Sequence, residues 1–206
     1  MLSKLKAHLI QGSEALGFHL SSEQCQLFQK LIDGLLLANQ QFNLTAIKDP
    51  IEVIDLHLLD SFTLKPWIDQ MQSGQIILDV GSGAGFPGLP LAVMYPQLQW
   101  RLIDARKKKV DYLQHTIQTL KLNNVQAIHS RLEHYPDPFD LMVCRAVSSC
   151  SQMIKWSQTH RPSKILMMKG QYPHDELAEL SCQACVTEVQ IPSCNVKRHI
   201  VELELR

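Results

Sequence analysis

The stretch that decides the fold is "DVGSGAGFPGLPL", residues 79–91, in which glycines and prolines follow an apolar run. The run "IILDVG" (76–81) is typical of a buried strand, and a helix is predicted to begin near Gly88. Glycines after the first strand of a parallel sheet let the backbone approach a ligand closely. We therefore expect this loop to hold a cofactor; the alternative is a plain tight turn.

Six further apolar runs follow this strand, and predicted helices separate the early ones. They are "WRLIDA" (100–105), "VQAIHS" (125–130), "FDLMVC" (139–144), "KILMMK" (164–169), "VTEVQI" (186–191) and "HIVELEL" (199–205). Strands that alternate with helices predict an α/β fold with a mostly parallel sheet covered on both faces. The last two runs alternate apolar and polar residues around the turn "PSCN", so we expect an antiparallel pair at one edge.

The pattern before the glycine loop is helical, and we assign residues 1–72 to an N-terminal helical region. Ser21 with Gln24 fits a capping box, and Asp49 followed by Pro50 fits an N-cap and first helical residue. Residues 73–206 then form the second region, and we expect one compact unit.

Composition excludes several classes of protein. The 206 residues are 45% hydrophobic, without an apolar run of bilayer length or a leader pattern, so we expect a soluble, cytoplasmic protein without membrane contact. The net charge of zero argues against indiscriminate polyanion binding. Residues 1–75 carry five basic and eight acidic side chains and the remainder 15 and 12, so the second part is expected to contact any nucleic acid.

The six cysteines are scattered, which favours free thiols over a disulfide framework. Cys182 and Cys185 have metal-ligand spacing but no second pair, and we interpret them as two cysteines on a helix end. We predict no metal site.

The details of the loop distinguish between cofactors. Counting from Gly81, a dinucleotide fingerprint requires a third glycine where this chain has Phe86. Asp104 closes the second strand at the spacing of an acid that binds a ribose diol. The pattern Asp-x-Gly-x-Gly-x-Gly resembles the first motif of S-adenosylmethionine-dependent methyltransferases, which implies a Rossmann-like class I fold with seven strands and an antiparallel last strand.

A narrower resemblance rests on seven segments in order. They are "FNLTAI" (42–47), "HLLDS" (57–61), "LDVGSGAGFPGLPLA" (78–92), "SRLE" (130–133), "FDLMVCRAVSS" (139–149), "MKG" (168–170) and "KRHIV" (197–201). This set resembles the bacterial small-subunit ribosomal RNA guanine-N7 methyltransferases, once called glucose-inhibited division protein B, over about residues 39–206. The resemblance implies S-adenosylmethionine as cofactor, methylation of a guanine N7 in 16S ribosomal RNA, and that RNA or the small ribosomal subunit as partner.

The resemblance also implies the residues that contact the cofactor. They are Gly81, Gly83 and Phe86 in the glycine loop, Asp104, Leu132 and Glu133 after the next two strands, and Arg145 after the fourth. For Arg145, an anionic partner is expected, either the cofactor carboxylate or an RNA phosphate. The alternative is a salt bridge within the fold.

The expected chemistry needs no catalytic side chain. Guanine N7 carries a lone pair and no proton, so it can attack a sulfonium methyl group without a general base, and holding the reactants in line supplies much of the rate. Cys144 lies near the position at which carbon-5 pyrimidine methyltransferases carry a nucleophilic cysteine. Because Val143 precedes it rather than proline, we favour a buried strand-end cysteine.

Basic residues suggest where RNA is bound. The expected contacts are Arg106 and Lys107 in the first turn of a predicted helix, with Lys169, Arg198 and His199 at strand ends. Solvated surface charge is the alternative for the helix cluster. For Asn43, His57 and Asp60, we favour a structural hydrogen-bond network over RNA contact. Guanine N7 is inaccessible in A-form RNA, so an unpaired target is expected.

Two other functions stay open on the sequence alone. One is an NAD-dependent oxidoreductase, against which Phe86 argues. The other is a ribosome factor that binds a nucleotide without catalysis.

Overall fold

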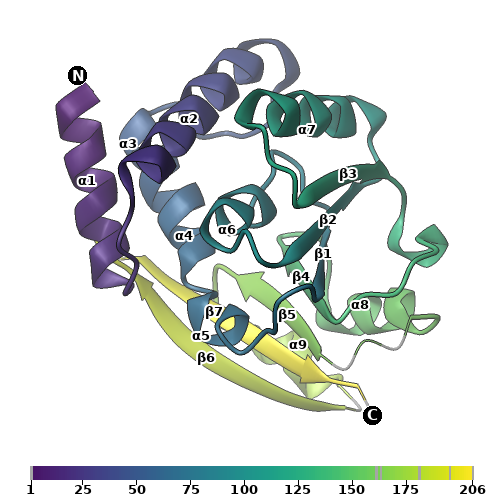
Figure 1. Cartoon of the computed structure of the whole chain (residues 1–206). Coiled ribbons are helices and arrows are strands. Elements are labelled where there is room, and N and C mark those ends of the chain that lie inside the picture. The colour runs from purple at the N-terminus through teal and green to yellow at the C-terminus, as the bar shows by residue number, and fades with distance from the viewer. Residues whose placement is uncertain (1, 161, 163, 181, 195, 206) are drawn as a thin grey trace.

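A computed structural model describes residues 2–160, 162, 164–180, 182–194 and 196–205, and shows a central sheet with helices on both faces (Figure 1). The strands are β1 (Ile76–Val80), β2 (Gln99–Asp104), β3 (Val125–His129), β4 (Leu141–Arg145), β5 (Lys164–Lys169), β6 (Gln183–Ile191) and β7 (Val196–Glu204). Their order across the sheet is β3-β2-β1-β4-β5-β7-β6. Strands β1 to β5 pair in parallel, so their carboxyl ends share one edge.

The last two strands confirm the expected antiparallel pair. Strand β7 lies between β5 and β6 and is antiparallel to both, with β6 at the edge. The prediction that Cys182 and Cys185 lie on a helix end is wrong, because β6 begins at Gln183 and Cys185 lies within it. The alternating exposure of β6 side chains suits an edge strand. The described residues contain no group of histidines, cysteines or acids that could hold a metal ion.

The N-terminal region is helical, as predicted. It contains α1 (Leu2–Ala15), α2 (Ser22–Phe42), α3 (Pro50–Val53), the π-helix η1 (Ile54–Leu59), α4 (Asp60–Phe62) and α5 (Lys65–Ile68). The capping box of Ser21 and Gln24 begins α2, and the Asp49 side chain caps α3, which confirms both predicted starts. Asn43 ends α2 in the left-handed conformation (φ 47°). No helix of the described chain is long and apolar enough to span a bilayer.

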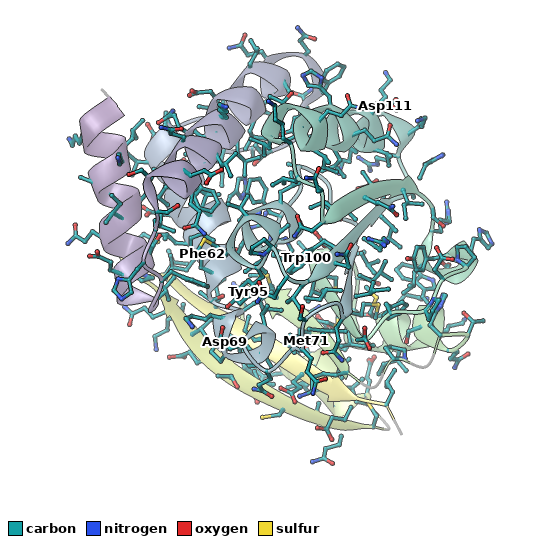
Figure 2. The ribbon with its side chains drawn as sticks, in the orientation of Figure 1. Phe62, Asp69, Met71, Tyr95, Trp100 and Asp111 are labelled. Atoms are coloured by element: carbon teal, nitrogen blue, oxygen red, sulfur yellow. The ribbon has the colours of Figure 1, made fainter. Side chains whose placement is uncertain are left out.

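Two hydrophobic clusters cover the two faces of the sheet. The remaining helices are α6 (Gly88–Met94), α7 (Lys107–Leu120), η2 (Leu132–His134), α8 (Cys150–Ser157) and α9 (His174–Ala178). On one face, α6 and α7 share a core with the N-terminal helices, in which Trp100, Phe62 and Tyr95 are buried (Figure 2). On the other face, side chains of η2, α8 and α9 pack against the second cluster. The boundary at residue 72 stays a prediction, since the first cluster runs through both regions.

Alanine substitutions at two helix glycines test whether α1 packs in this shared core. A Cβ atom at Gly12 in α1 would lie 2.3 Å from Cδ1 of the fully buried Leu59, whereas a Cβ at Gly34 in α2 would meet nothing within 4 Å. Alanine gains helix propensity at both positions, by about 1 kcal/mol. We expect Gly34→Ala to raise the free energy of unfolding by roughly 0.5–1 kcal/mol, and Gly12→Ala to lower it by about 1 kcal/mol through overpacking. Urea titration of both variants measures this; equal stabilisation would mean that α1 does not pack on η1.

Candidate active site

The glycine loop that follows β1 has little free space around its backbone. Gly81 has a φ of 67°, and a Cβ atom there would lie 2.6 Å from Cγ2 of Val147. The backbone N–H of Gly88 donates to Asp79 Oδ2 at 2.9 Å, and the Ser82 hydroxyl donates to the Asp79 carbonyl at 2.9 Å. Asp79 therefore ties the end of β1 to the first residue of α6, and the loop between them is fixed at both ends.

Asp79 is fully buried, and burial raises the pKa of its carboxyl group from 3.8 to about 7. Its Oδ1 atom has no hydrogen-bond partner among the described residues. Burial therefore favours the protonated form of this carboxyl group. Asp79 holds the loop through its Oδ2 atom, which accepts the hydrogen bond from Gly88.

Asp104 stands at the end of β2 with both carboxylate oxygens oriented by backbone groups. Gly83 N–H donates to Oδ2 at 3.0 Å, and Arg106 N–H donates to Oδ1 at 2.8 Å. The Lys109 ammonium lies 3.8 Å from Oδ2. Each oxygen keeps a further acceptor position, so the carboxylate can still accept hydrogen bonds from two neighbouring hydroxyl groups.

A cavity of about 220 Å³, called the first cavity here, opens beside these residues at the carboxyl edge of the sheet. Its lining residues are Val80, Gly81, Ile103, Asp104, Ala105, Ser130, Arg131, Leu132, Glu133, Val147 and Trp156. Four predicted cofactor contacts thus come together here: Gly81, Asp104, Leu132 and Glu133. Gly83 joins them through its hydrogen bond to Asp104.

The other two predicted contacts lie elsewhere. Arg145, at the end of β4, lines a second cavity of about 290 Å³. The lining of this second cavity is Ile47, Leu56, His57, Asp60, Arg145, Ala146, Met168, Lys169, Gly170 and Arg198. Phe86 is buried and lines neither cavity; its ring stacks on His57 with centroids 4.5 Å apart, and the Arg145 guanidinium lies 5.5 Å from its centroid. Both residues stay predictions as cofactor contacts.

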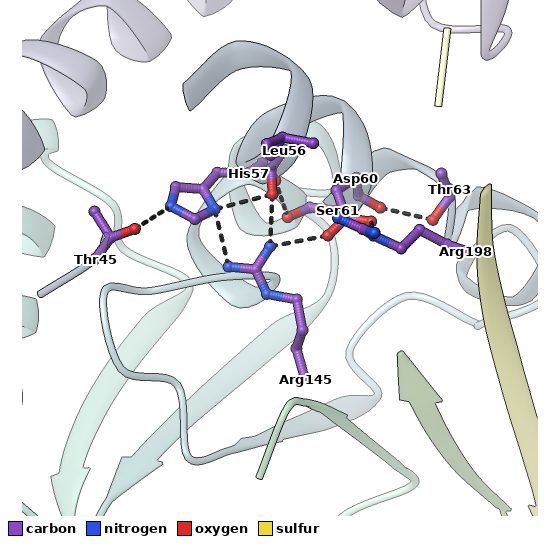
Figure 3. Close-up of polar contacts among 8 residues, drawn as sticks. All are labelled: Thr45, Leu56, His57, Asp60, Ser61, Thr63, Arg145 and Arg198. Atoms are coloured by element: carbon purple, nitrogen blue, oxygen red, sulfur yellow. Dashed lines mark hydrogen bonds and ion pairs between the residues drawn. The ribbon is translucent and has the colours of Figure 1, made fainter. Parts of the chain in front are cut away.

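The second cavity is organised by one buried carboxylate (Figure 3). Asp60, only 2% exposed, accepts from Arg145 Nη1 at 3.0 Å and from Arg198 Nε at 3.2 Å. Arg145 Nη1 also donates to the Leu56 carbonyl at 3.0 Å. These contacts join residues from η1, α4, β4 and β7. For Arg145 the structure shows the alternative, a salt bridge within the fold, and an external anion stays a prediction.

His57 completes this network as a neutral side chain. Its Nδ1 atom lies 2.9 Å from the Leu56 carbonyl oxygen and 3.1 Å from Arg145 Nη2. Its Nε2 atom lies 2.9 Å from Thr45 Oγ1. Burial and the positive charge of Arg145 lower the pKa of His57 from 6.5 to about 3. The network expected for His57 and Asp60 is confirmed, whereas Asn43 acts as the α2 cap.

A π-helical turn produces this convergence. Residues 54–59 form η1 between α3 and α4, and its wider turn presents the Leu56 carbonyl, the His57 ring and the Asp60 carboxylate to the same arginine. Such turns are rare and often occur at functional sites.

The predicted RNA contacts are spread along the same edge of the sheet. Arg106 and Lys107 are exposed at the start of α7, and Lys107 pairs with Asp111 at 2.6 Å. Lys169 is bound to Glu176 and to the Ser148 carbonyl, each at 2.9 Å. Lys169 and Arg198 line the second cavity. His199 faces Lys169 across the β5–β7 pair, and its Nε2 lies 3.7 Å from Glu188.

Sequence reasoning missed several residues of the site. Val147 and Trp156 line the first cavity, and Lys109 lies against Asp104. Only Lys109 carried a signal, as the last residue of the basic cluster; the two apolar residues have no pattern that distinguishes them from core.

The fold is that of the class I S-adenosylmethionine-dependent methyltransferases. The structure is similar to a SAM-dependent methyltransferase from Aquifex aeolicus (TM-score 0.56, 18% identity, 76% of this chain and 94% of that chain). It is also similar to magnesium protoporphyrin IX methyltransferase from Synechocystis PCC 6803 (TM-score 0.53, 16% identity, 72% and 78%). At these identities the likeness shows the fold alone.

The family is defined by sequence. The family model described as rRNA small subunit methyltransferase G matches residues 24–201. The chain is 35% identical to the ribosomal RNA small subunit methyltransferase G of Alteromonas mediterranea, over 98% of this chain and 97% of that protein. It is 38% identical to that of Ectopseudomonas mendocina, over 95% and 94%. The chain therefore belongs to the rRNA small subunit methyltransferase G family and is an enzyme that uses S-adenosylmethionine, which confirms the resemblance.

The shared carboxylate gives a first prediction for this site. Asp60→Asn removes the negative charge between two guanidinium groups, so we expect the free energy of unfolding to fall by about 2 kcal/mol, as for a lost hydrogen bond to a charged group. The control is Asp111→Asn, which breaks the exposed ion pair with Lys107; Asp111 is labelled in Figure 2. We expect this variant to lose about 0.5 kcal/mol or less of the free energy of unfolding. Equal losses in urea titration would show that Asp60 does not hold the arginines.

The low pKa of His57 gives a second prediction. The unfolded chain takes up a proton near pH 6.5, whereas folded His57 stays neutral down to about pH 3. The unfolded state binds more protons in this window, so the contribution of His57 to stability is complete above pH 6.5 and falls as the pH drops, by up to about 1.4 kcal/mol per pH unit. We expect the stability advantage of wild type over His57→Gln to shrink between pH 6.5 and 4. A difference that is constant with pH contradicts the assignment.

Proposed function

We propose that this chain methylates the N7 atom of a guanine in 16S ribosomal RNA, with S-adenosylmethionine in the first cavity and the guanine in the second. Membership of the rRNA small subunit methyltransferase G family supports the substrate and the reaction. One observation carries the arrangement: the neighbouring residues Ala146 and Val147 line the second and the first cavity respectively. A donor and an acceptor in these cavities would face each other across the end of β4.

The residues of the first cavity fit the proposed cofactor. The carboxylate of Asp104 is fixed at the cavity wall with acceptor positions left for a ribose diol. Gly81 keeps the loop free of a side chain where Val147 leaves no space for one. Apolar walls from Ile103, Leu132 and Trp156 suit a purine ring. When bound, S-adenosylmethionine supplies an electrophilic methyl group.

The side chains of the second cavity suit an acceptor that needs no deprotonation. Neutral His57 is held by Thr45 and Arg145 and has no free ring nitrogen to act as a base. Burial raises the pKa of the Cys144 thiol, and this side chain is 1% exposed. A nucleophilic role for Cys144 is therefore disfavoured, because the thiolate is the reactive form. The remaining task of the protein is to hold the two reactants in line.

The charge of the second cavity suits an RNA strand. The terminal nitrogens of Arg198 donate no hydrogen bond to the described residues, so they are available to a phosphate. Asp60 lies between the two arginines and offsets part of their charge, which matters because attack by N7 makes the purine ring cationic. Arg106, Lys107, Lys169 and His199 extend the proposed RNA contact, although Lys169 would have to exchange Glu176 for a phosphate.

The substrate we propose is an unpaired guanine in the ribosomal RNA or in the small subunit, within the cytoplasm. The test is transfer of a labelled methyl group to small subunits from cells that lack this protein, followed by identification of the methylated base. We expect 7-methylguanine in 16S RNA. Labelling at another atom overturns the N7 assignment. No transfer, together with NAD or another nucleotide raising the melting temperature, would favour the oxidoreductase or the non-catalytic factor.

Asp104 provides a test of the first cavity. Asp104→Asn keeps the shape of the side chain but removes the charge from hydrogen bonds to a ribose diol, so we expect S-adenosylmethionine to bind at least about tenfold more weakly. Calorimetric titration measures this, with Asp111→Asn as the exposed control. An unchanged affinity in Asp104→Asn would remove Asp104 from the cofactor site.

The chemistry predicts a flat pH profile. Because N7 has no proton to lose, the single-turnover rate on saturating substrate is expected to vary less than twofold between pH 7.5 and 9, above the pKa of Asp79. A tenfold rise per pH unit would reveal a general base.

A further inference from the structure

One exposed aromatic side chain lies near the second cavity and is used by nothing described above. Tyr172 is 44% exposed, and it is one of three large hydrophobic side chains exposed in the described part of the chain. The other two, Leu37 and Phe42, lie on α2. Tyr172 instead follows β5 by three residues, at the carboxyl edge where both cavities open.

The ring of Tyr172 is held in place despite its exposure. It packs against His174 with centroids 4.3 Å apart, and it meets His199 edge-on at 5.5 Å. The His174 N–H donates to the Tyr172 carbonyl at 3.1 Å, and the intervening Pro173 is buried. A restrained ring loses little conformational freedom when a ligand binds to it.

The surroundings of the ring connect it to the second cavity. Gly170, two residues before Tyr172, lines that cavity, and a Cβ atom there would lie 3.9 Å from Arg198 Nη1. His199, which contacts the Tyr172 ring, directly follows Arg198 in β7. Arg198 and His199 point to opposite faces of β7, so the ring lies at the same edge of the sheet as the second cavity and is linked to it through Gly170.

An exposed ring beside cationic side chains matches the chemistry of single-stranded RNA. Unpaired bases stack on tyrosine and histidine rings irrespective of sequence, while arginine and lysine contact the backbone. Acids also lie nearby, but Glu176 is paired with Lys169, and Glu188 with Lys197 and His199. The acidic charge next to the ring is thus partly compensated within the fold.

We propose that Tyr172 is a stacking platform for an unpaired nucleotide that flanks the target guanine in 16S ribosomal RNA. This inference rests on the proposed function, because it takes the second cavity as the place of the guanine. Tyr172 is then a positioning residue: it holds the neighbouring base and thereby fixes the strand that enters the cavity. Stacking of this kind selects unpaired RNA over a duplex, in which no base face is free.

The test separates stacking from other roles by substitution. We expect Tyr172→Ala to raise KM for small subunits about tenfold, with kcat within twofold of wild type and unchanged affinity for S-adenosylmethionine. Tyr172→Phe keeps the ring and should restore the wild-type KM. Phe42→Ala removes the other exposed aromatic ring, on α2, and is the matched control with an unchanged KM.

Each other outcome overturns the inference. A wild-type KM in Tyr172→Ala, a loss in Tyr172→Phe as large as in Tyr172→Ala, or an equal loss in Phe42→Ala excludes a stacking role for this ring. If the wild-type protein itself transfers no methyl group, the proposed function fails and the inference fails with it. If wild type is active and only Tyr172→Ala departs from expectation, the inference fails alone.

Crosslinking identifies the occupant directly. With the photoreactive residue p-benzoylphenylalanine in place of Tyr172, we expect an adduct to a 16S RNA nucleotide next to the methylated guanine. An adduct confined to a ribosomal protein, or to RNA far from the methylated base, overturns the proposal.

Discussion

The geometry of the second cavity depends on the carboxylate of Asp60. This buried group binds guanidinium groups from β4 and β7, while its own backbone belongs to the helical segment that follows η1. Two cations around one buried anion are stable only as a set, because removing the anion leaves charges without a partner. Burial and the positive charge of Arg145 keep His57 neutral, and its ring stacks on Phe86. The N-terminal helices are therefore part of the site and not only a cover for the sheet.

The sequence predicts the sheet well because its signals are local. Apolar runs of strand length, the turn before β7 and the two helix caps each depend on neighbouring residues. The structure confirms the strands, the caps and a turn at residues 192–194, whereas Asn195 of "PSCN" lies outside the described residues. The first cavity follows from topology, since parallel strands bring their carboxyl ends to one edge. For that reason Gly81, Asp104, Leu132 and Glu133, distant in sequence, line one cavity as the resemblance implies.

The second cavity is less predictable because it depends on contacts between distant segments. Arg145 and Asp60 are 85 residues apart, and Arg198 and Asp60 are 138 apart, so no local pattern shows that they share an ion-pair network. The π-helical turn of η1 is equally hidden, since its residues also fit an ordinary helix. The apolar pattern predicts that β6 begins at Val186 and not at Gln183, because Cys185 and its neighbours alternate in exposure without strongly apolar residues. Side chains that act through shape, such as Val147, leave no chemical signature.

The central claim is that donor and acceptor meet across the end of β4, between Val147 and Ala146. The most direct measurement is a structure of this protein with S-adenosylhomocysteine on a small subunit that lacks the methyl group. The account predicts the cofactor product in the first cavity, a guanine flipped into the second, and its N7 atom facing the sulfur past Ala146 and Val147. A guanine bound on another face of the protein, or N7 turned away from the sulfur, would contradict it.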